Sequence, residues 1–150
     1  MKITENFTLE ELTKSATATR LGIDNTPNTE QFNNLKALCV NVLQPIREAY
    51  GKPIKVSSGF RCEKLNKAVG GSATSEHRYG MAADIHSLSD TLLDNMELWR
   101  VIRSLDLDFG QLIWEYGSNV GPDWIHISYN PKRNRKQILR CKGGKYSEID

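Results

Sequence analysis

Residues 75–84, SEHRYGMAAD, contain two side chains of the kind that bind metal ions, His77 and Asp84. A catalytic zinc usually takes three protein ligands from histidine, aspartate, glutamate or cysteine and leaves a fourth position for water. Side chains alternate between the two faces of a strand, so Asp84 can point into a site from MAADIH while His77 approaches from the preceding loop. Gly80 and two alanines leave room for this approach. The spacing is therefore compatible with two ligands of one metal site.

The third ligand has two candidates among the remaining histidines. His86 shares a strand face with Asp84, but neighbours two residues apart on one strand reach a common ion only with strain. His126 lies in PDWIHISY, where Ile125 and Ile127 alternate with it and are expected to face the core. From spacing alone, a surface loop histidine and a partly buried structural histidine remain the alternative to a metal site.

One carboxylate lies close to this candidate ligand in the sequence. Asp123 is three residues before His126 and follows Pro122, where the chain is still turning into the expected strand. A carboxylate at that point is able to act on a metal-bound water as a general base.

Helices are expected in the first third of the chain and again after residue 88. Thr8 with Glu11 three residues later has the spacing of a capping box, which predicts a short helix. Apolar residues recur at three- and four-residue steps over 32–49, which predicts a long amphipathic helix capped by Asn28 or Thr29 and kinked at Pro45. A further helix is expected over 89–105, with an inner face of Leu92, Met96, Trp99 and Ile102.

Short runs rich in β-forming residues follow from residue 53 and predict strands. They are PIKVSS at 53–58, MAADIH at 81–86, QLIWEY at 111–116 and WIHISY at 124–129. Helices first and then strands interrupted by one helix predict an α+β domain with a small, mainly antiparallel sheet and helices packed around it. With 150 residues and no repeat or linker, residues 1–150 are expected to form one domain.

Composition excludes several classes of protein. The net charge of +2 is too small to indicate nucleic-acid binding, and the basic segment 132–145 is expected to be a solvated face, with contact to an anionic polymer as the alternative. Cys39, Cys62 and Cys141 are odd in number and widely spaced, so no disulfide framework is expected. No run of 18 apolar residues occurs, so we expect no membrane span.

Three segments resemble one family of metallopeptidases. SEHRYGMAAD has all five fixed positions of SxHxxGxAxD, the signature of the zinc D-Ala-D-Ala peptidases, which share a fold with lysostaphin-type enzymes and the hedgehog signalling domain. SSGFR at 57–61 is similar to the family's SGxR segment, and DWIH at 123–126 is similar to its [ED]xxH segment. The resemblance spans roughly residues 50–130, and the start of the chain is similar to small phage and bacterial members of the carboxypeptidase-like branch. It implies the hedgehog/DD-peptidase type of α+β fold.

The resemblance also implies roles for single residues. His77, Asp84 and His126 match the ligands of one Zn²⁺ ion.

Asp123 matches the family's general base, and Arg61 matches an arginine that faces the substrate or the developing oxyanion, with a structural salt bridge as its alternative. Ser75 is expected to fix the loop before the strand by a hydrogen bond. Glu115 is the rival base, since its side chain has the longer reach, and its alternative role is to orient a zinc-bound histidine. Asp123 is preferred over Glu115, and His86 is expected to be peripheral.

The function implied by the resemblance is zinc-dependent hydrolysis of peptidoglycan stem peptides. The reaction is either a D-Ala-D-Ala carboxypeptidase or an L-Ala-D-Glu endopeptidase reaction, the latter being used by phage endolysins. The alternative is a zinc-containing module of the same fold that binds cell-wall peptide, or serves in phage structure, without cutting. We expect a monomer whose partner is the peptidoglycan peptide, with no nucleic acid. Because MKITENFTLEEL contains no signal peptide, we expect synthesis in the cytoplasm and action on the cell wall, with holin-dependent release as the route.

Overall fold

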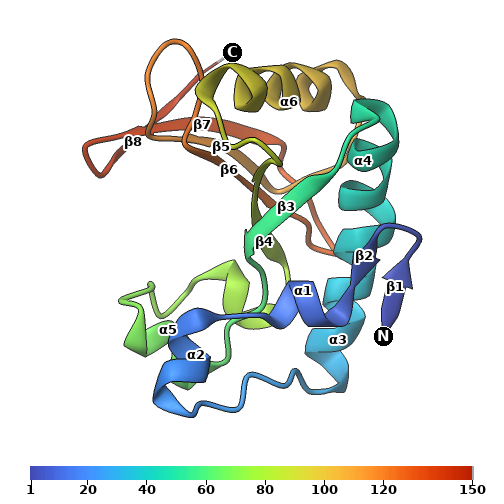
Figure 1. Cartoon of the computed structure of the whole chain (residues 1–150), viewed down its shortest axis with the longest axis vertical. Coiled ribbons are helices and arrows are strands. Elements are labelled where there is room, and N and C mark those ends of the chain that lie inside the picture. Colours follow the sequence, from blue (N-terminus) through green and yellow to red (C-terminus); the bar gives the residue numbers. More distant parts are fainter. Residues whose placement is uncertain (150) are drawn as a thin grey trace.

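The computed structural model describes residues 1–149, and Figure 1 shows how its helices and strands are arranged. The helical elements are α1 (Leu9–Thr13), α2 (Ala16–Leu21), α3 (Thr29–Leu38), the π-helical turn η1 (Cys39–Leu43), α4 (Gln44–Tyr50), α5 (Glu63–Ala68), the 3₁₀ turn η2 (Glu76–Tyr79) and α6 (Leu92–Ser104). The strands are β1 (Lys2–Thr4), β2 (Phe7–Thr8), β3 (Ile54–Ser58), β4 (Ala82–Ser87), β5 (Gln111–Glu115), β6 (Trp124–Ser128), β7 (Gln137–Lys142) and β8 (Lys145–Glu148). The α+β class expected from the sequence is confirmed.

Local sequence signals set where the first helices begin. Thr8 and Glu11 form the predicted capping box of α1, in which each side chain accepts a hydrogen bond from the other residue's backbone N–H. Asn28, one of the two predicted caps, closes the same kind of box with Gln31 at the start of α3. Both boxes satisfy backbone donors that a helix end otherwise leaves unpaired.

The long amphipathic helix is not a single regular helix. It consists of α3, η1 and α4 in direct succession, and the Gln44 N–H donates to the carbonyl of Cys39, five residues back. Pro45 then occupies the first turn of α4, where its missing N–H leaves no intrahelical bond unmade. The interruption predicted at Pro45 therefore takes the form of a π-helical turn just before it.

The main sheet is mixed, with strand order β3-β4-β6-β5-β7-β8. Only β5 and β7 pair in parallel, and the other neighbours are antiparallel, in agreement with the mainly antiparallel sheet expected. The sequence did not predict β7 and β8. Much of the segment 132–145, expected to be a solvated basic face, belongs to this hairpin, and two of its side chains, Leu139 and Cys141, are buried.

The two faces of the sheet differ in character because side chains alternate along each strand. Ile85 on β4, Ile125 and Ile127 on β6, and Leu112 and Trp114 on β5 are buried in the main apolar core. The helices cover this side: α6 packs on β4 and β6, and in Figure 1 it lies at the top, with α3 and α4 at the right. The alternate positions, which include Asp84, Glu115 and His126, face the other side.

Helix α6 also holds a polar group in the core. Of the inner face predicted for it, Trp99 and Ile102 are buried and Met96 packs against the core, whereas Leu92 is only half-buried. Asn95 and Leu98, which were not predicted, are fully buried. Asn95 Oδ1 accepts from the backbone N–H of Ser87 at 2.8 Å, and Asn95 Nδ2 donates to the carbonyls of both residues before β6, each at 3.1 Å. This one side chain thus ties the end of β4 to the entry of β6.

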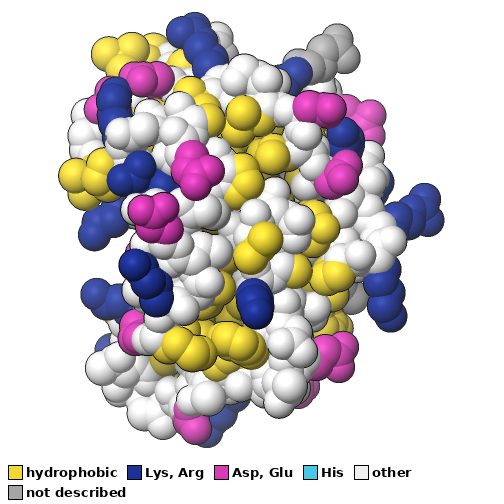
Figure 2. All heavy atoms as spheres, turned by 90° about the vertical axis from the view of Figure 1, so that its right-hand side faces the viewer, with side chains coloured by type: hydrophobic (Ala, Val, Ile, Leu, Met, Phe, Trp, Pro, Cys, Tyr) yellow, Lys and Arg dark blue, Asp and Glu magenta, His cyan; other side chains and the backbone are white. Residues whose placement is uncertain are grey.

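The helical side of the surface carries no concentration of one charge. Figure 2 shows acidic and basic side chains interspersed there, and no histidine of the described residues is visible on that face. Within residues 1–149, no helix is both long enough and apolar enough to cross a bilayer.

Candidate metal centre

His77 is held by the turn η2 and by the strand-to-helix loop beside it. The hydroxyl of Ser75 caps this turn by accepting from the His77 N–H at 3.3 Å. His77 is 3% exposed, and its Nδ1 lies 2.7 Å from the carbonyl oxygen of Gly59. A carbonyl only accepts, so Nδ1 carries the proton and Nε2 is left as the free ligand atom.

Gly80 ends the same turn in a conformation that a side chain opposes. Its φ is +74°, and a Cβ there would lie 2.5 Å from the carbonyl oxygen of Gln31 on α3. The left-handed conformation alone costs an alanine about 1–2 kcal/mol. We expect Gly80→Ala to lower the free energy of unfolding by more than this, because of the added contact with α3. Urea denaturation measures this loss.

Gly22→Ala is the matched control for that prediction. Gly22 also has a left-handed φ, +66°, but a Cβ there meets nothing within 4 Å. Gly22→Ala should lose only the conformational part of the free energy of unfolding. Equal losses in Gly22→Ala and Gly80→Ala would show that the contact with α3 is unimportant.

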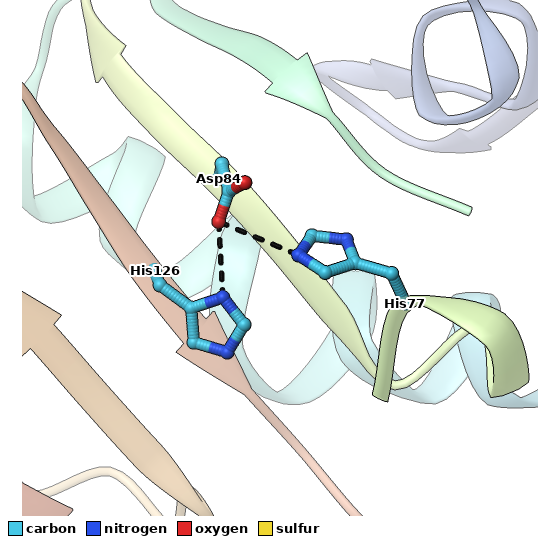
Figure 3. Close-up of side chains that lie close together, drawn as sticks. All are labelled: His77, Asp84 and His126. Atoms are coloured by element: carbon cyan, nitrogen blue, oxygen red, sulfur yellow. Dashed lines mark hydrogen bonds and ion pairs between the residues drawn. The ribbon is translucent and has the colours of Figure 1, made fainter. Parts of the chain in front are cut away.

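Asp84 and His126 come together because they are directly opposed on neighbouring strands. They are Cα partners in the antiparallel β4–β6 register. Asp84 Oδ1 lies 3.0 Å from His126 Nδ1 and 3.5 Å from His77 Nε2. Figure 3 shows both imidazole rings turned towards this carboxylate, His126 from β6 and His77 from the turn before β4.

The three side chains fit a tetrahedral metal ion. One ligand atom from each of them lies within 4.8 Å of the others. Ligands bound at about 2.0–2.1 Å in a tetrahedron are about 3.3 Å apart, close to the two separations from Asp84. Two nitrogens and one carboxylate oxygen are also a donor set that catalytic zinc accepts. The residues present therefore fit this metal and leave a fourth position open.

The charges of the group reinforce one another. Burial opposes ionisation of Asp84, but hydrogen bonds from His126 and His77 outweigh it and hold the pKa of this carboxyl well below its ordinary value. Burial also disfavours the charged form of His126, but the hydrogen bond and negative charge of Asp84 outweigh it and raise the pKa of His126. The carboxylate is thus ionised and available at neutral pH.

A cavity of about 910 Å³ opens from these three residues over the exposed face of the sheet. One wall comes from the segment 61–77, which includes Arg61, Ser75 and Glu76. The floor and far wall come from β5 to β8, through Gln111, Ile113, Glu115, Trp124, Gln137, Leu139, Tyr146 and Glu148. In Figure 1 the β7–β8 hairpin lies at the upper left and α5 at the lower left.

Arg61 lines the cavity without a strong partner. Its Nη1 and Nη2 donate to the hydroxyls of Ser58 and Ser75 at 3.4 and 3.3 Å, and its buried Nε has no hydrogen bond. Among residues 1–149, no carboxylate lies within ion-pair distance of Arg61. Burial lowers the pKa of Arg61 and the charge of Asp84 opposes that shift. The guanidinium is available to an anionic group that enters the cavity.

The two candidate bases have different surroundings. Glu115 is 6% exposed, lines the cavity and lies near enough to His126 and Asp84 to feel their charges. Burial raises the pKa of Glu115, and the positive charge of His126 opposes the shift. Asp123 is exposed and does not line the cavity; its N–H donates to the carbonyl of Glu115 at 2.9 Å. Asp123 precedes the first residue of β6, so it does not share the strand face of His126.

His86, the remaining histidine of the chain, is not part of the candidate metal centre. His86 lies outside the group of three, with Nδ1 2.7 Å from the carbonyl of Ser87 and 3.4 Å from Asp90. Tyr116 and Tyr146, two aromatic side chains that line the cavity, and the β7–β8 residues were not predicted from the sequence. Alternation along QLIWE places Gln111 and Ile113 on the face of Glu115, a signal that was present in the sequence.

Comparison with known proteins agrees with this fold. A model of the peptidase M15 family matches residues 5–128. The chain belongs to the peptidase M15 family.

A zinc D-Ala-D-Ala carboxypeptidase of Streptomyces albus G is 52% identical to the chain over 44 residues. That stretch is 29% of the chain and 17% of the carboxypeptidase, so the chain matches only a small part of the length of this curated relative.

Proposed function

We propose that the protein is a zinc peptidase that hydrolyses stem peptides of peptidoglycan. The observation that carries the proposal is the convergence of His77, Asp84 and His126 at the edge of an open cavity. Membership of a peptidase family and the partial match to a zinc D-Ala-D-Ala carboxypeptidase support it. We further propose that residues 1–150 act as one domain, since the main core packs residues from Ile3 to Ile149 together.

His77, Asp84 and His126 are proposed as the ligands of one zinc ion. A zinc ion held there supplies an activated water and a Lewis acid for the scissile carbonyl. Gly59 fixes the tautomer of His77 through its carbonyl oxygen, and Asp84 keeps its negative charge because the neighbouring histidines lower its pKa. These contacts hold the ligand atoms in place before a metal binds.

We propose Glu115, rather than the Asp123 preferred from the sequence, as the general base. Glu115 lies in the cavity wall on the same sheet face as His126, two residues along β5 from Ile113, the Cα partner of His126. Its carboxylate would take the proton of the attacking water and return it to the leaving amine. The surroundings of Asp123, exposed and outside the cavity lining, support this choice.

Arg61 is proposed to bind a carboxylate of the substrate or the developing oxyanion. Arg61→Ala should lower kcat/KM on a stem pentapeptide about 10- to 100-fold, the range expected for loss of a hydrogen bond to a charged group. Arg61→Lys should restore part of this loss, since it keeps the charge without the planar fork. Steady-state kinetics measure both, and unchanged kinetics in Arg61→Ala would reduce this residue to a structural role.

The bond that is cut decides between the two reactions. A pentapeptide of the form L-Ala-D-Glu-(diamino acid)-D-Ala-D-Ala is incubated with the protein, in one sample with zinc and in another with chelator. The products are identified by mass spectrometry. Chelator-sensitive loss of one D-Ala identifies a carboxypeptidase, and release of L-Ala identifies an endopeptidase of the kind used in phage endolysins. If the protein retains zinc but cleaves neither this peptide nor cross-linked peptidoglycan, peptide binding replaces hydrolysis as the proposed function.

The cell wall is the proposed place of action. We propose synthesis in the cytoplasm followed by release, by a holin in the case of a phage protein. The peptidoglycan peptide is the proposed partner, and a monomer is the proposed state.

A further inference from the structure

The cavity floor consists of side chains aligned across the sheet. Asp84, His126, Ile113, Leu139 and Glu148 are successive Cα partners from β4 through β6, β5 and β7 to β8. All of them line the cavity, so this row lies on one face. It begins at the proposed metal ligands, crosses two apolar side chains and ends at a carboxylate on the edge strand.

The length of this row matches a short piece of extended peptide. Neighbouring strands lie about 4.8 Å apart, so Glu148 is three strands, or about 14 Å, from His126. Two extended residues span about 7 Å, and the flexible four-carbon stem of a lysine carries its ammonium several ångströms further. The diamino residue is the second residue from the cut bond in both candidate reactions, on its N-terminal side in one and on its C-terminal side in the other. A peptide bound along the row therefore brings this amine within reach of β8.

The carboxylate of Glu148, at the far end of the row, suits a cation. Glu148 is exposed and, within residues 1–149, has no ion-pair partner, while the amide of Gln137 donates to its Oε1 at 3.1 Å. Tyr146, which is 58% exposed, lines the cavity on the same strand. Arg61 is on the opposite wall of the cavity.

We infer that the β7–β8 hairpin is the specificity wall of the cavity and that Glu148 binds the amine-bearing side chain of the substrate's diamino residue. The inference rests on the proposed function for its substrate class. The hairpin follows the residues that match the family model, 5–128. Ile113 and Leu139 provide an apolar surface for the methylenes and methyl groups between the two ends.

The test compares two peptides that differ by one charge. L-Ala-D-Glu-L-Lys-D-Ala-D-Ala and its norleucine analogue are titrated into the metal-free protein in chelator, and Kd is measured by calorimetry. The unmodified protein should bind the lysine peptide about two- to fivefold more tightly, the range of an exposed ion pair. Glu148→Gln should abolish this preference, and Glu148→Lys should reverse it. Glu48→Gln, on the exposed side of α4, is the control and should preserve it.

Each result supports or overturns the inference. It is overturned if the unmodified protein binds both peptides equally or binds neither, or if Glu148→Gln keeps the preference. The inference is also overturned if Glu148→Gln raises the Kd of both peptides by the same factor, since that is the effect of a merely structural residue. Cleavage of both peptides by the zinc-loaded protein is measured in parallel. If the expected binding preference is found but no hydrolysis, the proposed reaction is refuted and the proposed role of the hairpin stands.

Discussion

Asp84→Ala should yield a protein that no longer retains zinc. Asp84 is the central member of the proposed ligand set, because its Oδ1 faces both His126 at 3.0 Å and His77 at 3.5 Å. Its loss removes one of three ligands and the only negative charge among them. Zinc affinity should fall by more than the roughly 10- to 100-fold that loss of an outer partner of a metal ligand typically costs. Elemental analysis after dialysis, with a competition titration against a chelator, measures the change.

His86→Ala is the control for this experiment. His86 lies two residues further along β4, but its ring contacts Ser87 and Asp90 and is not part of the group. This variant should retain zinc like the unmodified protein. Unchanged zinc content in Asp84→Ala, or loss of zinc in both variants, would refute the ligand assignment.

Glu115→Gln should retain zinc and lose most of its turnover. The amide has almost the same shape but cannot accept the proton of the attacking water, and a positioned general base typically contributes 10²–10⁴-fold. We expect a fall of about this size in kcat on a stem peptide. Because burial raises the pKa of Glu115, the base is progressively protonated as the pH falls through that raised value. The acid limb of the kcat/KM profile should therefore lie above the ordinary range of a glutamate and disappear in the variant.

Asp123→Asn separates the two candidate bases. Asp123 is exposed outside the cavity, so its amide should keep both zinc and activity. Full activity in Glu115→Gln together with loss of activity in Asp123→Asn would return the role of base to Asp123.

The parts of the fold that follow local rules were predictable from the sequence. Thr8 with Glu11 and Asn28 with Gln31 fix helix starts through bonds that span three residues, and both capping boxes form. The meeting of His77, Asp84 and His126 was also expected, because strand alternation and the motif both led to it. Their roles as metal ligands remain a prediction.

What the sequence did not reveal depends on contacts between distant segments. The β7–β8 hairpin was missed because lysines and arginines dominate its segment, while the burial of Leu139 and Cys141 depends on pairing with β5. Asn95 in the core of α6 was missed for a similar reason, since its partners are backbone groups near residues 87 and 122. Where Asp123 points depends on the residue at which β6 begins, and a one-residue difference changes the face.

The β7–β8 hairpin joins the main sheet by pairing with β5, beyond the strands that carry the proposed metal ligands. All residues proposed to hold the metal precede residue 127, whereas the hairpin joins the sheet beyond β5. Relatives that exchange this hairpin for another would keep their hydrolytic centre and acquire a different choice of peptide. Its complete loss would leave β5 as a bare edge open to pairing with another chain. Selection is therefore expected to replace the hairpin more readily than to delete it.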